Sequence, residues 1–222
     1  MLRPRTWQAP SGQHELALCT GPGARAQLLI LPAWFDEANK LRHLTVATIR
    51  ALEAAGITSV LPDLPGCNES PSPLEEQDLD SWRKAARLAA EQHGCTHVLT
   101  IRASAHIAPD LPGFAYAPIA PDTALRALTR ARVIASQEGG RKENAANLIE
   151  SGRQDGLELT GYNLGSNMIA QMSDSAAVLP EALRVIRQAE IGGAALWLRS
   201  EPDHDQAQAE ALARLIAAEM AT

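Results

Sequence analysis

Apolar positions follow two different spacings along this chain. Short runs of apolar residues have the length of buried strands, and the three clearest cover residues 27–31, 57–61 and 97–101. Residues 39–55 and 78–93, which lie between these runs, place apolar side chains at helical spacing. Gly56 and Gly94 follow these segments, where a glycine commonly ends a helix. The pattern predicts right-handed strand–helix–strand units, hence an α/β fold with a mainly parallel sheet and helices on both faces.

The remaining segments carry weaker patterns. Residues 14–20 alternate and predict an edge strand, whereas residues 1–13 are expected to be irregular. A last buried strand is expected over residues 193–198, followed by an alanine-rich helix over residues 205–219. Short helices are predicted at residues 122–136, 144–151, 164–172 and 181–188. The length of 222 residues suits one domain, so we expect residues 1–222 to form a single domain with residues 122–189 as a helix-rich segment.

Composition narrows the classes of function. Hydrophobic residues make up 45% and charged residues 21%, which is ordinary for a globular protein. A net charge of −6 argues against a nucleic-acid surface. The three cysteines contain no CxxC pair, so we expect neither a disulfide framework nor a metal site, and we expect no cofactor. Without an apolar signal core or a run of about 20 apolar residues, the chain is expected to be cytoplasmic and not membrane-embedded.

Ordered motifs across the chain resemble those of a known family. Two of the motifs lie in the later segments 118–132 and 158–164. The others lie between residues 32 and 70, where the matching residues are Pro32, Phe35, Glu37, Asn39, Lys40, Arg42, Asp63, Leu64, Pro65, Gly66, Cys67 and Ser70. Together they are similar to the α/β-hydrolases, and more narrowly to the type 2 exosortase A-associated hydrolases of Gram-negative bacteria. The resemblance implies an α/β-hydrolase fold in trimmed form, ester or thioester chemistry, an exopolysaccharide setting, and a helical cap at residues 122–189.

The residues themselves depart from that chemistry at the nucleophile. An α/β-hydrolase places its nucleophile in a Gly-x-Ser-x-Gly turn after a central strand. Alignment by the end of the run 97–101 puts Arg102 in this position, and the resemblance implies arginine there as well. A guanidinium has no lone pair with which to attack a carbonyl. Shifting the frame by two residues makes Ser104 the candidate nucleophile, but Pro109 and Pro112 leave little room for the helix that supports such a turn.

The general base is also absent from its usual loop after the last strand. His204 is the last histidine, and it could act as base with Asp203 or Asp205 as the acid. The alternative is an acidic, solvated helix start. His106 lies near the candidate turn, where a structural role competes with one as the base.

A ligand-binding interpretation is open beside catalysis. The backbone N–H groups of Ala33 and Trp34 lie in the first strand–helix loop and could bind an anion, with Arg102 opposite. The competing interpretation is an ordinary helix start in which Glu37 pairs with Arg42. The expected ligand is a small acyl or carboxylate compound.

Three functions therefore compete at this point. The first is a binding or accessory protein without a working triad, acting near an exopolysaccharide or exosortase pathway. The second is an ester or thioester hydrolase that uses Ser104 with His204 or His106. The third is an interaction module, such as a homodimer, that uses residues 122–188 as its contact face.

Overall fold

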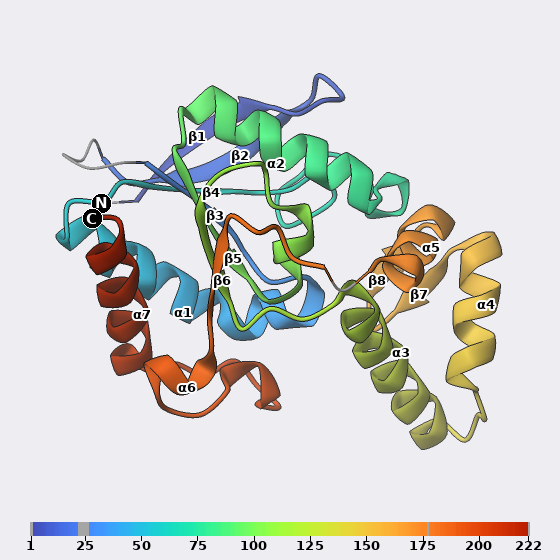
Figure 1. The fold of residues 1–222 in the computed structure, drawn as a ribbon. Coiled ribbons are helices and arrows are strands. Elements are labelled where there is room, and N and C mark those ends of the chain that lie inside the picture. Colours follow the sequence, from blue (N-terminus) through green and yellow to red (C-terminus); the bar gives the residue numbers. More distant parts are fainter. Residues whose placement is uncertain (1, 22–26, 177, 222) are drawn as a thin grey trace.

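A twisted sheet forms the centre of the molecule (Figure 1). The computed structural model describes residues 2–21, 27–176 and 178–221. Within these residues, one sheet has the strand order β1-β2-β4-β3-β5-β6-β9. In chain order its strands are β1 (Arg3–Gln8), β2 (His14–Cys19), β3 (Leu28–Leu31), β4 (Ser59–Pro62), β5 (His97–Ile101), β6 (Gly113–Tyr116) and β9 (Leu183–Ile186). The pairs β1–β2 and β2–β4 are antiparallel and the others are parallel, which confirms the predicted fold class.

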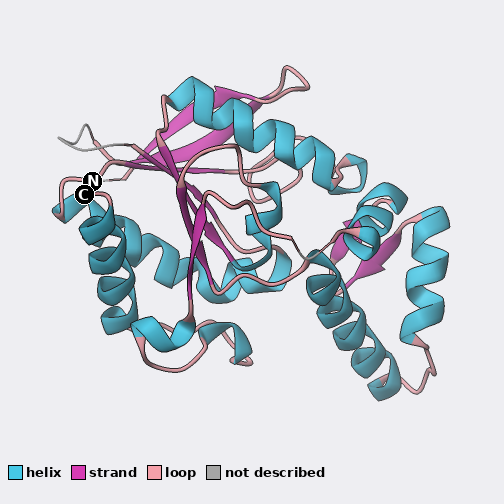
Figure 2. Cartoon of the chain, viewed as in Figure 1, coloured by secondary structure: helices cyan, strands magenta, loops and turns pink. Residues whose placement is uncertain are grey.

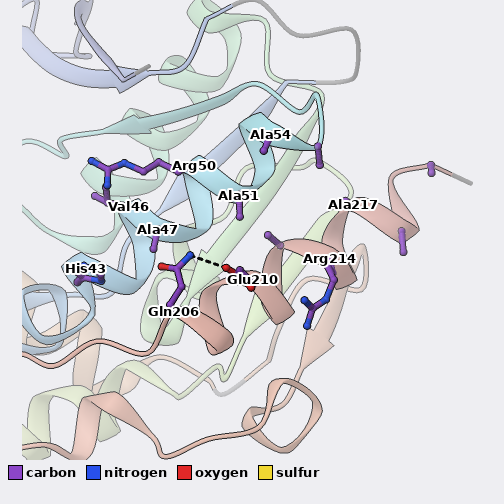
Figure 3. A pocket seen from close by; sticks show the side chains of 14 residues that line it. His43, Val46, Ala47, Arg50, Ala51, Ala54, Gln206, Glu210, Arg214 and Ala217 are labelled. Atoms are coloured by element: carbon purple, nitrogen blue, oxygen red, sulfur yellow. Dashed lines mark hydrogen bonds between the residues drawn. The ribbon is translucent and has the colours of Figure 1, made fainter.

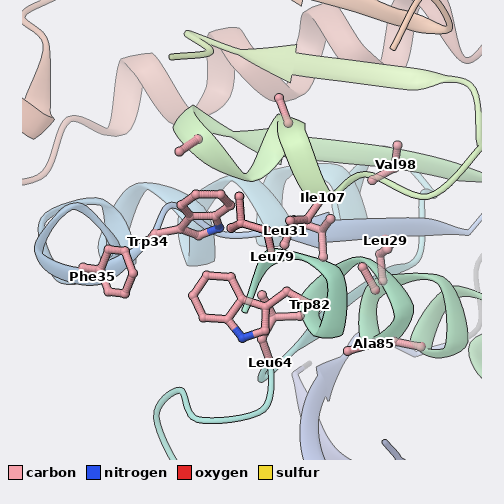
Figure 4. Close-up of a cluster of buried hydrophobic side chains, with 14 of the residues drawn as sticks. Leu29, Leu31, Trp34, Phe35, Leu64, Leu79, Trp82, Ala85, Val98 and Ile107 are labelled. Atoms are coloured by element: carbon pink, nitrogen blue, oxygen red, sulfur yellow. The ribbon is translucent and has the colours of Figure 1, made fainter. Parts of the chain in front are cut away.

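Helices cover both faces of the sheet (Figure 2). The helices α1 (Phe35–Ala54) and α7 (Gln206–Glu219) pack on one face, and α2 (Leu79–His93) packs on the other. The side chains of β3 alternate accordingly, because Leu28 and Ile30 join the core under α1 and α7 whereas Leu29 and Leu31 join the core under α2. Figure 4 shows this second core, where Trp34, Phe35 and Trp82 lie close together at the start of α1.

A separate group of elements extends beyond the carboxyl ends of the parallel strands (Figure 1). The group, here named the cap segment, comprises α3 (Pro121–Glu138), α4 (Ala145–Asp155), the hairpin β7 (Leu157–Leu159) and β8 (Tyr162–Leu164), and α5 (Ser166–Asp174). Gly165 fixes it against the short helix η1 (Leu74–Glu76), because a Cβ there would lie 2.1 Å from the carbonyl oxygen of Glu75. Gln171 adds a hydrogen bond to the backbone N–H of Asp80 in α2.

Four predictions of local structure differ from the structure. Residues 181–188 are not a helix: they contain β9, which pairs in parallel with β6, and the next short helix α6 (Gln188–Ile191) begins at their end. Residues 193–198 are not a strand, since they end in the single turn η3 (Leu196–Leu198). Gly192 and Gly193 have φ angles of 75° and 73°, which break extended backbone at that point. Residues 3–8 are not irregular either, because they form β1, which pairs with β2. The strand predicted at residues 14–20 is therefore not an edge strand, since β2 lies between β1 and β4.

Among the described residues, no helix is both long enough and apolar enough to cross a membrane.

Candidate functional site

The tip of β5 has the backbone geometry of a sharp strand-to-helix turn. Arg102 follows β5 directly and opens the short helix η2 (Arg102–Ile107). Its φ angle is 62°, a left-handed conformation that side-chain-bearing residues seldom adopt and that is often found at functional sites. In the α/β-hydrolase architecture this strained turn presents the nucleophile. The residue after β5 therefore has the backbone conformation expected of the nucleophile position, but its side chain is the guanidinium of Arg102.

The guanidinium of Arg102 is held on several sides. Its Nε and Nη2 donate to the two carboxylate oxygens of Glu37 at 2.9 Å and 3.0 Å, and its Nη1 donates to the carbonyl oxygen of Ala117 at 2.7 Å. The ring of Trp197 lies 4.1 Å from the guanidinium carbon, which adds a cation–π contact. The predicted pairing of Glu37 with Arg42 is therefore wrong, because Glu37 turns toward β5 instead of along its own helix.

Ser104 lies beneath the turn, away from solvent. The side chain is fully buried. Its hydroxyl lies 2.9 Å from the carbonyl oxygen of Leu31 and 3.0 Å from that of Ile101, and it accepts the backbone N–H of Ile101 at 2.9 Å. These bonds tie η2 to β3 and β5, so in this conformation Ser104 supports the turn from below.

The other predicted triad members lie elsewhere. The exposed ring of His204 contacts that of His43 in α1 at a tilt of 47°, with ring centroids 4.7 Å apart. Asp203 is also exposed, and it accepts the backbone N–H of His204 at 2.8 Å. Burial lowers the pKa of His106, which keeps this half-buried imidazole neutral. In the part of the chain described, neither histidine ring hydrogen-bonds to Ser104, so the structure does not assemble the predicted set.

A cavity of about 610 Å³ opens beside Arg102. This space, named the Arg102 cavity, lies between the start of α1, the tip of β5, α3 and η3. Its size falls within the range of roughly 300–1,000 Å³ that is typical of small-molecule sites. Its position outside the carboxyl ends of parallel strands is also where open α/β sheets bind ligands. Six residues that line it are Trp34, Glu37, Lys40, Arg102, Tyr162 and Trp197.

The charges in this cavity are balanced. Lys40 pairs with Asp36 at 2.7 Å, one turn apart on α1, and Arg102 pairs with Glu37. Two cations therefore face two carboxylates. Burial raises the pKa of Tyr162, so its phenol remains a neutral hydrogen-bonding group on the cavity wall.

The predicted anion site is only partly assembled. Trp34 lines the Arg102 cavity, but Ala33 lines a neighbouring chamber. The indole Nε1 of Trp34 is buried and has no hydrogen-bond partner among the described residues. Sequence reasoning missed Lys40, Tyr162 and Trp197 as wall residues. Tyr162 stands in the segment 158–164 that carried the family resemblance, and that was the signal that could have identified it.

Another, more open hollow lies apart from this site. It measures about 1060 Å³ and runs between α1 and α7, where alanines dominate its walls (Figure 3). Gln206 and Glu210 are joined by a hydrogen bond of 3.0 Å at its edge. It shares no lining residue with the Arg102 cavity and contains none of the predicted site residues.

Comparison with known proteins identifies the fold. No family model and no curated protein sequence matches the chain. The structure of Est1E from Butyrivibrio proteoclasticus with bound ferulic acid matches 98% of this chain and 100% of its own, with a TM-score of 0.58 and 15% identity. The α/β-hydrolase GrgF from Penicillium sp. sh18 matches 79% of this chain and 73% of its own, with a TM-score of 0.50 and 10% identity.

Other matched structures align with only part of this chain. Epoxide hydrolase VrEH1 from Vigna radiata aligns with 57% of this chain and 46% of its own, with a TM-score of 0.44 and 17% identity. In four of the matched structures, the aligned part covers only 43% to 54% of the other chain, so this chain spans about half their length. The full-length match to Est1E, together with the strand order and the strained turn after β5, shows that the chain has the α/β-hydrolase fold.

Proposed function

We propose that this protein binds a small acyl compound without hydrolysing it. The observation that carries the proposal is the tip of β5, where Arg102 occupies the strained turn and pairs with Glu37 through two hydrogen bonds. Acyl hydrolysis requires a nucleophile at that tip, and a guanidinium cannot supply one. The hydroxyl of Ser104 lies buried beneath the turn and is bonded to backbone groups.

The electrostatics of the Arg102 cavity favour a neutral ligand. A guanidinium has five N–H donors, of which three are used by Glu37 and Ala117. The two remaining N–H groups suit the carbonyl oxygen of an ester, thioester or amide. A free carboxylate would instead be repelled by the negative charges of Glu37 and Asp36, and Glu37 already neutralises the guanidinium beside it. Of the two ligand classes expected from the sequence, we therefore propose the neutral acyl class.

The biological setting rests on the motif resemblance alone. On that basis we propose an accessory role in the cytoplasm beside an exopolysaccharide or exosortase system. The cap segment would then face a protein partner or a second copy of the chain. Ile134, in α3 of the cap segment, is a large apolar side chain that is exposed at 49%. Sedimentation of Ile134→Ser beside the native chain tests that contact.

The binding proposal is tested with methyl butanoate as the probe. Titration, followed by the fluorescence of Trp34 and Trp197, is expected to show saturable binding, while proton spectra show that the ester stays intact. Arg102→Met is expected to weaken binding at least tenfold because the carbonyl loses its charged donor. Arg153→Met is the matched control, since Arg153 also forms a two-bond pair with a carboxylate, Asp174, and lies outside this cavity.

A fluorophosphonate probe tests the opposite function directly. We expect no labelling, because the probe needs an activated hydroxyl. Labelling that Ser104→Ala abolishes would show that Ser104 reaches the surface and that the protein is an ester hydrolase. Intact folding with no binding of the ester would also overturn the proposal.

A further inference from the structure

A second, smaller chamber adjoins the Arg102 cavity. It measures about 260 Å³ and lies between the β3–α1 turn, the loop after β4, η1 and β8. This space is named the Cys67 chamber. None of the described residues that line it is charged, in contrast to the four charged side chains of the Arg102 cavity. Six of its wall residues are Ala33, Trp34, Phe35, Leu64, Cys67 and Leu74.

The two spaces share one wall. Trp34, Phe35, Asn39 and Tyr162 line both of them. The Nδ2 of Asn39 donates to the phenol oxygen of Tyr162 at 3.2 Å, and the ring of Phe35 lies 5.3 Å from that of Tyr162. Asn39 is exposed and Tyr162 is half-buried on a short hairpin, so one hydrogen bond and one ring contact hold the Tyr162 side chain between the two spaces.

The described walls of the Cys67 chamber carry no charge, so it suits an apolar group. Burial, and then the nearby carboxylates of Asp63 and Glu15, raise the pKa of the Cys67 thiol to about 12, so the thiol stays neutral. A neutral, half-buried thiol behaves as a small apolar group and not as a nucleophile. The volume is below the range of roughly 300–1,000 Å³ for a complete small-molecule site, which suits one end of a ligand.

We propose that the Cys67 chamber holds the aliphatic tail of the acyl ligand whose carbonyl binds Arg102. The proposal rests on the proposed binding function and adds the shape of the ligand: a neutral carbonyl group with a short unbranched chain. Tyr162 is the positioning residue between the two spaces. It separates head from tail when bonded to Asn39, and it admits the chain when it turns aside.

Chain length is the variable that tests this arrangement. Methyl butanoate, methyl hexanoate and methyl octanoate are titrated against the native protein, with the intact ester confirmed after each titration. Affinity is expected to rise about fourfold for each methylene that enters an apolar chamber. Cys67→Phe fills the chamber, so it is expected to remove the gain in affinity of the octanoate over the butanoate. Leu74→Trp fills it from the opposite wall and serves as the second variant if Cys67→Phe does not fold.

Cys95→Phe is the matched control for enlarging a half-buried thiol. Cys95 also has a pKa raised to about 12 by burial, and it lines neither space. It is expected to keep the native dependence on chain length. Tyr162→Phe removes the bond to Asn39 without changing the ring and is expected to speed octanoate association.

The outcomes separate the two proposals. Binding of all three esters with equal affinity overturns the tail chamber and leaves the Arg102 site in place. A chain-length dependence that survives in both filled variants also overturns the chamber. Absence of binding by every ester overturns the proposed function itself.

Discussion

Two arginine–carboxylate pairs in this molecule have nearly the same geometry and lie in different surroundings. Arg102 and Glu37 join the tip of β5 to α1, with side chains exposed at 9% and 22%. Arg153 and Asp174 join α4 to α5 within the cap segment, with side chains exposed at 32% and 66%. Each pair makes two hydrogen bonds between 2.8 Å and 3.0 Å. Bond lengths alone therefore do not distinguish the site from an ordinary surface contact.

What separates the pairs is access to water. An exposed ion pair gains little because water solvates both charges well when they part. In a shielded pair, removing one partner leaves the other charge poorly solvated, and the loss is large. Arg102 adds a cation–π contact and a bond to the carbonyl oxygen of Ala117, whereas Arg153 is supported by a long contact to the carbonyl oxygen of Ala170 at 3.5 Å. We infer that the Arg102–Glu37 pair fixes the shape of the cavity. The Arg153–Asp174 pair is an ordinary surface contact that contributes little to stability.

The largest expected effect is the loss of stability in Arg102→Met. Glu37 would remain partly shielded without its cation, and the free energy of unfolding is expected to fall by about 3 kcal/mol. Arg153→Met is expected to lose far less. Urea denaturation of both variants measures the difference, provided the dependence on urea concentration has the same slope in each. Equal losses in the two variants would mean that the Arg102 cavity is open to water and that its pair is an ordinary surface contact.

Coupling between the partners gives the next largest effect. A double-mutant cycle with Arg102→Met and Glu37→Gln is expected to give a coupling energy of about 2 kcal/mol. It should change little between 0.1 M and 1 M sodium chloride, because screening is weak in shielded sites. The corresponding cycle with Arg153→Met and Asp174→Asn is expected to give a small coupling that disappears in 1 M salt. A salt-sensitive coupling at Arg102 would contradict its shielding.

Local pattern was enough to predict much of the fold. The limits of β5 agree with the apolar run 97–101, and Asp78 caps α2 through the backbone N–H of Ser81. Such features depend on neighbours in the chain. The run Leu183–Ile186 is too short for its apolar spacing to distinguish a helix from a strand, so the sequence pattern placed it in a helix. Its pairing with β6 makes it a strand.

The site was less predictable because its contacts join distant segments. Counting from the end of β5 gave the position of Arg102, since this depends on the strand alone. Its partner Glu37 lies 65 residues away, and Trp197 comes from a segment that the sequence pattern assigned to a strand. Pairing within α1 was the local expectation for Glu37, and tertiary structure overrode it. Burial of Ser104 likewise follows from the packing of η2 under β3, which no motif records.

The smallest expected effect is a pH dependence confined to the exposed pair. Arg153 lowers the pKa of Asp174 below its ordinary value, first through hydrogen bonding and then through its charge. A carboxylate with a lowered pKa in the folded state contributes stability above its unfolded pKa, and that contribution is lost as pH falls through the folded value. The difference in unfolding free energy between the native chain and Asp174→Asn should therefore be constant from pH 7 to pH 5 and should shrink below pH 4 or so. It should also shrink in 1 M salt at pH 7, because water and ions screen this pair. A difference that persists at low pH would show that the amide, and not the charge, changes the packing between α4 and α5.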